Sequence, residues 1–290
     1  MYHNEPVPSY QDMMLYYGRE MLRNGADGIY FDNIYETTSS DPDTSSAVET
    51  SPGSFQLSYP IFGMRELLKR TATMLYCENK LLMGRPLLRL HMTNCNIVPF
   101  MSFGLMTLNW EHHYGSCDYQ DRFQAPYILT ECLGTQTGTV PNILVQASGE
   151  EKIPWIYRTM LATIFAYDLM PFYLHQSPLL PVIKNTVNKI YGFGYGNPGV
   201  QVFPGWSPVN PVRLSRPDAK VTAAIKPRDA ALLMIGDMGN GGELEIDLSG
   251  LKFTGCKVYN AENGQLIGES AKVKITLKKH DFALLKVENK

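Results

Sequence analysis

The segment GADGIYFDN, residues 25–33, constrains the fold of this chain more than any other stretch. Its apolar run of Ile29, Tyr30 and Phe31 is typical of a buried strand, and the run ends on a carboxylate, Asp32. When such a strand belongs to a (β/α)8 barrel, a side chain just past its C-terminal end points into the active-site mouth. Asp32 is therefore the first candidate for a catalytic residue.

The residues before this strand predict a helix and a tight turn. Ser9 can cap a helix over residues 10–24, with Asp12 at the N3 position. Gly25 suits the left-handed residue that ends a helix. Helix, turn, strand and carboxylate together make one α/β unit.

The first two thirds of the chain alternate helices with apolar strands, which predicts a parallel sheet. A polar loop at residues 37–58 follows Asp32, and its length is typical of a lid or a binding loop over a cleft. Pro60 then opens a further helix. Strands are expected at residues 87–92, 104–111, 142–147 and 169–174. A helix is expected within residues 118–134 and another at residues 155–167.

A linker rich in glycine and proline begins near Tyr191, and short strands without helix signals follow it. These strands are expected at residues 222–225, 230–235, 243–248, 257–259, 272–277 and 282–287, with hairpin turns at GNGG (239–242) and ENG (262–264). The pattern predicts an antiparallel β-sandwich. We therefore expect an α/β fold in two domains. Residues 1–195 form a partial (β/α)8 barrel with the catalytic site, and residues 196–290 form the C-terminal β-sandwich.

The strand count falls short of a whole barrel. The α/β part holds about five strands, whereas a complete barrel needs eight strands and roughly 200 residues or more. If the strand before Asp32 is strand four, the later runs fall naturally as strands five to eight. We expect the back portion of a larger enzyme that begins at an internal methionine, with a short open α/β sheet as the alternative.

Composition and charge argue against several kinds of partner. The formal net charge of −2 gives no electrostatic reason to expect nucleic acid or an anionic membrane. No apolar run approaches the roughly 20 residues of a membrane span, and residues 1–5 show no secretory signal. Five cysteines without a C-x-x-C pair argue against a structural zinc site or a disulfide framework. The pattern implies no cofactor.

Three strand ends converge if the α/β part is a barrel. The strands end at Asp32, at His91 and at Glu111. Two carboxylates across a cleft are what glycosidic bond cleavage uses, because one protonates the leaving oxygen and the other supports the oxocarbenium-like state. Asp32 and Glu111 are therefore the predicted catalytic pair.

Polar and aromatic side chains near these strand ends are candidates for binding a sugar. Trp110 can stack on the CH face of a pyranose. Adjacent His112 and His113 point oppositely on an extended chain, so no metal site is expected there. The predicted substrate-binding residues are Asn33, His91, Asn94, Trp110, Asp118 and Arg122, with Asn109 and Gln146 as further hydrogen-bond partners.

Three segments of the α/β part resemble barrel glycoside hydrolases: GADGIYFDN, LHMTN (90–94) and LNWEHHYG (108–115). The likeness is greatest to uncharacterised bacterial glycosidase-like proteins allied with glycoside hydrolase family 123. VYNAENGQLIG (258–268) resembles the C-terminal sandwich of many such enzymes, including the α-galactosidase clan. The resemblance covers essentially the whole chain, as the latter part of those proteins. It implies hydrolysis of O-glycosidic bonds in a carbohydrate substrate, and a secreted or periplasmic setting.

The resemblance implies two competing roles for the acidic residues. The α-galactosidase clan implies Asp32 as nucleophile and Glu111 as acid/base, with Asp118 in reserve. Family 123 implies an adjacent Asp-Glu pair in substrate-assisted cleavage, but Asn33 stands where that Glu would be. An asparagine cannot donate the required proton, so the pairing of Asp32 with Glu111 is favoured.

Two other functions compatible with the sequence remain open. One is a non-catalytic carbohydrate-binding protein or a truncated, inactive homologue of a glycosidase. The other is a metal-dependent hydrolase that uses Asp32, His91 and Glu111. The sugar, the anomer, the linkage and the oligomeric state are also left open by the sequence.

Overall fold

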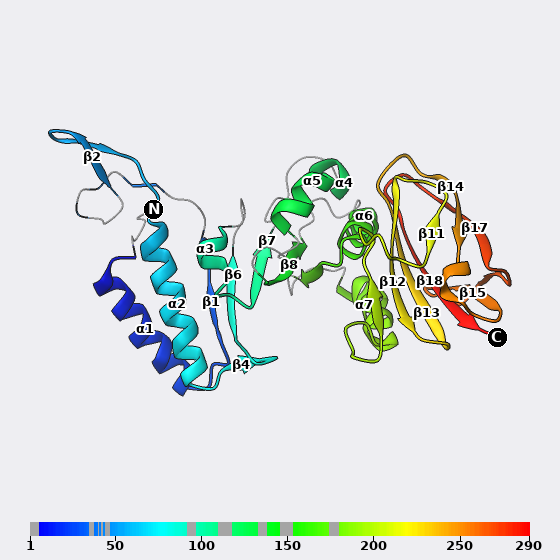
Figure 1. The fold of residues 1–290 in the computed structure, drawn as a ribbon, viewed down its shortest axis with the longest axis horizontal. Helices are drawn as coiled ribbons and strands as arrows, with labels where there is room; N and C mark the ends of the chain where they lie inside the picture. The colour runs from blue at the N-terminus through cyan, green and yellow to red at the C-terminus, as the bar shows by residue number, and fades with distance from the viewer. Residues whose placement is uncertain are drawn as a thin grey trace. The chain divides into compact units, whose positions relative to one another are not determined.

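The structure is a computed structural model of the chain, and two compact units are distinguished in it (Figure 1). Unit 1 comprises residues 1–111 and 130–143, and unit 2 comprises residues 112–129 and 144–290. The expected domain boundary after residue 195 stays a prediction. The residues that the structure describes are 6–34, 38–39, 41, 43, 47–91, 97–109, 118–132, 138–145, 153–173 and 180–290.

Unit 1 is built on a parallel sheet in the order β1-β6-β7-β8. This confirms the parallel sheet predicted from the alternation of helices and strands. The elements are α1 (Pro8–Arg23), β1 (Ile29–Phe31), β2 (Val48–Ser51), β3 (Ser54–Gln56), α2 (Ile61–Cys77), β4 (Leu81–Leu82), β5 (Arg85–Pro86), β6 (Leu88–His91), α3 (Val98–Met101), β7 (Met106–Asn109) and β8 (Val140–Val145).

Helix α1 begins two residues earlier than expected. Pro8 occupies the first helical position after Val7, so Ser9 lies inside the first turn and makes no capping hydrogen bond. Proline suits that position because it has no N–H group to satisfy there. The predicted end of the helix is confirmed, since Gly25 has a φ of 103°.

The polar segment after Asp32 contains a strand pair that the sequence did not suggest. Strands β2 and β3 form an antiparallel hairpin, and each residue of β2 is exposed. Strands that are exposed on both faces lack the alternation of apolar and polar residues, so the sequence pattern predicts a loop here instead of a hairpin. Its expected position over a cleft stays a prediction, and residues 35–37, 40, 42 and 44–46 lie outside the described residues.

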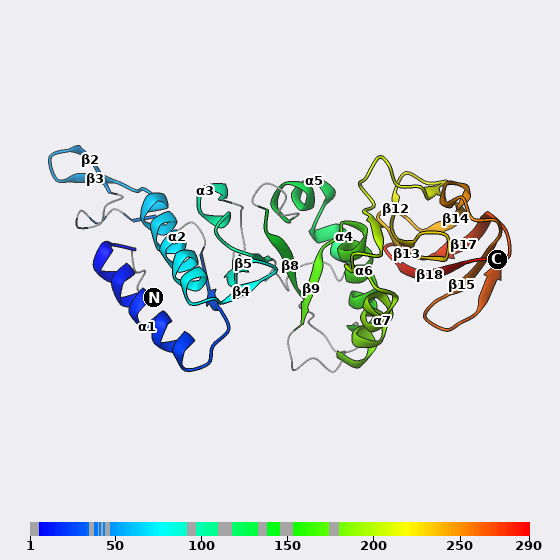
Figure 2. The ribbon, with the colours of Figure 1, turned by 60° about the horizontal axis from the view of Figure 1, so that its bottom comes forward.

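The core of unit 1 lies between the sheet and two helices. Helices α1 and α2 contact one another and lie side by side in both views (Figures 1 and 2). Leu68, Thr71 and Leu75 share the buried face of α2. They pack with side chains of β6 such as Leu88 and Leu90, which are fully buried.

Unit 2 carries short helices and the β-sandwich. The elements are α4 (Tyr119–Arg122), α5 (Ala125–Tyr127), α6 (Ile153–Ala166), β9 (Met170–Tyr173), α7 (Leu180–Phe193), β10 (Gln201–Phe203), β11 (Arg213–Leu214), β12 (Ala219–Lys226), β13 (Ala230–Asp237), β14 (Gly242–Asp247), a 3-10 helix (Ser249–Leu251), β15 (Cys256–Asn260), β16 (Leu266–Gly268), β17 (Lys272–Leu277) and β18 (Phe282–Asn289). Residues 118–134 include helix, as expected, in the form of α4, α5 and a π-helical turn, Ile128–Cys132. Helix α7 was not expected at all.

The sandwich is confirmed, with a sheet in the order β10-β12-β13-β18-β15-β16 and a smaller sheet in the order β11-β14-β17 (Figure 2). The strand pairs in both sheets are antiparallel. The hairpin at ENG is confirmed, because β15 pairs with β16 and Gly264 has a φ of 79°. The GNGG hairpin was wrong: residues 239–242 join β13 of one sheet to β14 of the other, so those strands do not pair.

The larger sheet has two differently used faces. Alternate side chains such as Leu233, Leu285 and Val258 point into the sandwich core. Helix α6 packs on β13 across the other face, and no added Cβ fits at Gly236, because it would lie 2.5 Å from the Ala162 carbonyl oxygen. Within the described ranges, no helix has the length and apolar character that crossing a membrane requires.

Gly236→Ala should separate α6 from β13 and destabilise the fold. We expect a loss of about 1–3 kcal/mol in the free energy of unfolding, the usual cost of overpacking. Chemical denaturation followed by circular dichroism measures it. Gly199→Ala is the matched control, because nothing lies within 4 Å of a Cβ added at Gly199. Equal stability of the two variants would contradict the close approach.

Candidate active site

Asp32 and His91 meet at the C-terminal edge of the parallel sheet in unit 1. Strands β1 and β6 pair with Phe31 opposite Leu90, so the residues that follow, Asp32 and His91, come side by side. Tyr30 precedes Asp32 by two positions, and residues two apart on a strand project to the same side. The parallel register therefore brings three polar groups together at one strand end.

The three groups form a compact hydrogen-bonded cluster around one carboxylate oxygen. His91 Nδ1 lies 2.6 Å from Asp32 Oδ1, and the Tyr30 hydroxyl donates to the same oxygen at 3.0 Å. The Tyr30 hydroxyl also lies 2.7 Å from His91 Nδ1, and the two rings stack. The backbone N–H of Asn33 donates to Asp32 Oδ1 at 3.0 Å. Among the described residues, none binds Oδ2 through a hydrogen bond or an ion pair.

The cluster keeps Asp32 ionised and accessible. Burial raises the pKa of the Asp32 carboxyl, but the hydrogen bonds from His91 and Tyr30 and the attraction of His91 outweigh it, so the pKa lies below its ordinary value. The Asp32 side chain is 57% exposed, whereas that of His91 is 4% exposed. A lowered pKa means that ionised Asp32 favours the folded state above the ordinary carboxyl pKa, a contribution lost as the pH falls through the folded value.

Asn33 contributes through its backbone. Its φ of 53° is in the left-handed region, which asparagine tolerates better than most residues. This turn aims the Asn33 N–H at Asp32. A direct contact of the Asn33 side chain with a sugar stays a prediction.

The remaining sequence-predicted residues of this site divide into two groups. Asn109 ends β7 and is buried, and the pairing of His91 with Leu108 places it at the same sheet edge as His91. The others lie outside the described residues, so their placement stays a prediction: Glu111, Asn94, Trp110 and Gln146.

Sequence reasoning missed Tyr30 as a functional residue. It was read as part of a buried strand, yet its side chain is 48% exposed and its hydroxyl reaches both Asp32 and His91. The spacing Tyr-x-Asp at the end of a strand is the signal that could have identified it, because it places the phenol on the same side as the carboxylate.

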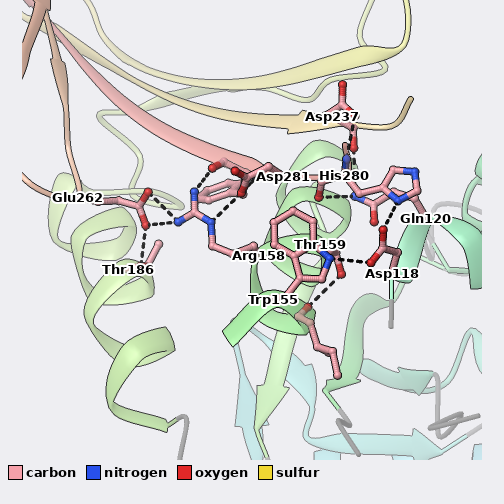
Figure 3. Close-up of polar contacts among 12 residues, drawn as sticks. Asp118, Gln120, Trp155, Arg158, Thr159, Thr186, Asp237, Glu262, His280 and Asp281 are labelled. Atoms are coloured by element: carbon pink, nitrogen blue, oxygen red, sulfur yellow. Dashed lines mark hydrogen bonds and ion pairs between the residues drawn. The ribbon is translucent and has the colours of Figure 1, made fainter. Parts of the chain in front are cut away.

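Asp118, predicted to bind substrate, ties elements of unit 2 together. Its Oδ1 accepts a hydrogen bond from Trp155 Nε1 of α6, and its Oδ2 lies 2.7 Å from His280 Nδ1 (Figure 3). The Trp155 bond is also 2.7 Å long, and the Asp118 side chain is 17% exposed. Arg122 lies with its guanidinium 4.3 Å from the ring centroid of Tyr119. A role of Asp118 and Arg122 in sugar binding stays a prediction.

His280 links this segment to the sandwich. Its backbone N–H donates to Asp237 Oδ2 at 2.9 Å, and its carbonyl oxygen accepts from Gln120 Nε2 at 3.2 Å. Ligand atoms of Asp118, Asp121 and His280 lie within 4.8 Å of one another, a spacing that suits a metal ion. The hydrogen bond between Asp118 and His280 already accounts for the position of that ring.

Arg158 of α6 makes the second polar link to the sandwich (Figure 3). Its Nη1 donates to both carboxylate oxygens of Glu262, at 2.8 and 2.9 Å, and its Nε donates to Asp281 at 2.8 Å. The guanidinium also donates to the carbonyl oxygen of Phe282. One partly buried cation thus satisfies acceptors from two separate turns of the sandwich.

Comparisons with known proteins show the fold. No protein-family model matches the sequence, and no curated protein matches it. The structure is similar to a GH27 β-L-arabinopyranosidase from Geobacillus stearothermophilus in complex with arabinose, with a TM-score of 0.58 and 11% identity over 97% of this chain. The chain spans 62% of the length of that enzyme.

Two further solved structures are similar to the structure of this chain. An α-galactosidase I from Mortierella vinacea matches with a TM-score of 0.56 and 12% identity, over 97% of this chain and 72% of its own. An α-amylase from Geobacillus thermoleovorans, complexed with acarbose, matches with a TM-score of 0.54 and 7% identity, over 99% of this chain and 66% of its own.

These likenesses define the class of fold. The chain has the fold of part of a (β/α)8 barrel followed by an antiparallel β-sandwich, as found in barrel glycoside hydrolases. Identities of this size show the fold alone. The particular resemblance to family 123 stays a prediction.

Tyr30→Phe should raise the pKa of the Asp32 carboxyl toward its ordinary value, because it removes one of the hydrogen bonds that favour the anion. Titration of the Asp32 side-chain carbon by NMR measures the change. Tyr76→Phe is the matched control, since Tyr76 is an exposed tyrosine on α2. If the pKa of Asp32 is unchanged in Tyr30→Phe, the Tyr30 hydroxyl does not stabilise the Asp32 anion.

Arg158→Met should destabilise unit 2, because Glu262 and Asp281 would be left partly buried without their partner. We expect a loss of about 1–3 kcal/mol in the free energy of unfolding, below the cost of breaking a fully buried pair. Lys274→Met removes an exposed ion pair with Glu243 and should change stability by less than about 0.5 kcal/mol. Urea denaturation compares them, and equal losses would refute a special role for Arg158.

Proposed function

We propose that this protein hydrolyses O-glycosidic bonds, with Asp32 as the carboxylate that acts at the anomeric carbon. The observation that carries the proposal is the state of Asp32: ionised, exposed, and held by three donors on a single oxygen. Because those donors all bind Oδ1, the carboxylate is fixed in orientation, while Oδ2 has no hydrogen-bond partner among the described residues. A carboxylate serving only to cap the turn would not require His91 and Tyr30.

The chemistry follows from a pair of carboxylates across a cleft. Asp32 Oδ2 attacks the anomeric carbon as nucleophile or stabilises the positive charge that develops there, and Glu111 protonates the leaving oxygen. If Asp32 is the nucleophile, water then hydrolyses the glycosyl ester with Glu111 as base. His91 and Tyr30 act by positioning Asp32. Asn33, Asn94 and Trp110 of unit 1 are proposed sugar-binding residues, and Asp118 and Arg122 of unit 2 are separately proposed to bind sugar.

Fold likeness supports this choice of reaction. The similar structures are named as an arabinopyranosidase, an α-galactosidase and an α-amylase, the first in complex with arabinose and the third with acarbose. Within this group we favour the pairing of the α-galactosidase clan over that of family 123, since Asn33 cannot act as the acid. The resemblance to bacterial glycosidase-like proteins allied with family 123 belongs to this proposal.

Asp32→Asn and Glu111→Gln should each lower the turnover of a hydrolysed glycoside by about 100-fold or more, the range of general acid–base and nucleophilic roles. Release of p-nitrophenol from α-galactoside, β-L-arabinopyranoside and α-glucoside substrates measures this. Asp27→Asn is the matched control, because Asp27 is an exposed carboxylate just before β1, with a side chain that is 92% exposed.

Three outcomes would go against the proposal. Near-normal rates in a variant would remove that residue from the mechanism. Binding of a sugar by the folded protein without any turnover would favour the non-catalytic carbohydrate-binding protein instead. Turnover abolished by a chelator and restored by one divalent ion would favour the metal-dependent hydrolase.

A further inference from the structure

A groove of about 890 Å³ lies in unit 2, where the end of α7 meets the outer face of the larger sheet. We name it the α7 groove. Its walls come from Lys189 and Phe193 of α7, Lys226 of β12, Tyr259 of β15 and Lys286 of β18, and Leu232 of β13 forms its floor. The volume is within the range of sites that bind small molecules.

The strand register explains why these side chains share one surface. Leu232 lies opposite Lys286, and Lys286 lies opposite Tyr259, so the three stand in one row across neighbouring strands. The residues next to them along the strands, Leu233 and Val258 among them, belong to the sandwich core. Because side chains alternate along a strand, the row faces away from that core.

The polar groups in the groove balance donors against acceptors. Three lysines bring ammonium donors, and Asp229 and Glu288 bring carboxylate acceptors. Lys189 donates to the carbonyl oxygens of Ala261 and Glu262 at 2.9 and 2.7 Å. Lys286 pairs with Glu288 at 2.6 Å. The groove therefore has polar walls of both signs beside an apolar floor.

Aromatic rings complete the site. The ammonium of Lys226 lies 4.6 Å from the ring centroid of Phe193, which covers one face of that ring. Tyr259 of β15 is half-buried and also lines the groove. A tyrosine of this kind offers an apolar face for stacking together with a hydroxyl for hydrogen bonding.

We propose that the α7 groove binds a neutral oligosaccharide, as a second sugar site in addition to the candidate active site. Sugar hydroxyl groups both donate and accept hydrogen bonds, and their CH faces pack on aromatic rings, which matches this combination of lysines, carboxylates and Tyr259. The charges of the three lysines and of the two carboxylates nearly cancel, so the groove has no strong electrostatic preference for an anionic or a cationic ligand. The inference rests on the proposed function for its choice of carbohydrate as the ligand class.

Two glycines provide a matched test. A Cβ added at Gly192, which lines the groove, or at Gly199, which does not, meets nothing within 4 Å. Gly192→Phe therefore fills the groove without a clash of its Cβ, whereas Gly199→Phe places the same ring elsewhere. Tyr259→Ala removes the stacking face.

Calorimetric titration of the full chain carrying Asp32→Asn is the experiment, with maltotetraose, β-1,4-galactotetraose and tetragalacturonate as probes. We expect one neutral probe to bind with a dissociation constant on the order of 1 mM. Gly192→Phe should weaken that binding at least about tenfold, Tyr259→Ala roughly tenfold, and Gly199→Phe not at all.

Other results would overturn the inference. The first is the absence of binding heat with either neutral probe up to about 10 mM. The second is tighter binding of tetragalacturonate than of the neutral probes. The third is an equal change in affinity for Gly192→Phe and Gly199→Phe in variants with normal melting temperatures. Failure of the proposed function is distinguishable from failure of the groove, because it appears as an unchanged rate of glycoside hydrolysis in Asp32→Asn. The groove is tested by binding alone, so either idea can fail while the other holds.

Discussion

The pairing of β1 with β6 is the constraint on which the candidate active site depends. Phe31 lies opposite Leu90, and this register alone makes Asp32 and His91 neighbours. A slip by one residue would turn every side chain of β1 to the other face. Gly28 helps to fix the pairing, because a Cβ there would lie 2.4 Å from the carbonyl oxygen of Leu87. Backbone packing before the strand thus determines chemistry at its end.

Unit 2 shows how one sheet serves two purposes. The inner side chains of the larger sheet fill the sandwich core. Helix α6 covers part of the outer face, where Gly236 permits its close approach. Beside α7 the outer face is left open as the α7 groove. Two sets of polar contacts hold α6 on the sandwich. Trp155 of α6 donates to Asp118, which in turn binds His280. Arg158 of α6 donates to Glu262 and Asp281, which lie in two different turns of the sandwich. Directional bonds at these points add to the close packing of α6 on β13.

Much of the fold could be predicted because apolar periodicity is a local property. Most strands of the sheets and helix α2 were found in this way, and so was the carboxylate after β1, whereas the short strands β10, β11 and β16 were missed. Helix α7 was missed because glycines near its end suggested a linker, and β2 with β3 because exposed strands carry no apolar pattern. The cluster at Asp32 could be predicted only in part. Its His91 follows from strand order, whereas the contribution of Tyr30 depends on rotamers that a sequence does not reveal.

The turn between β15 and β16 has a consequence for how this protein can vary in length. Surface hairpins ordinarily accept inserted residues. Here the carboxylate of Glu262 is bound by Arg158, and Lys189 holds the carbonyl oxygens of Ala261 and Glu262. An insertion before Glu262 would break contacts with two helices at once, whereas one at the exposed tip, at Asn263, would break neither. We therefore expect inserted residues to be tolerated on only one side of this turn.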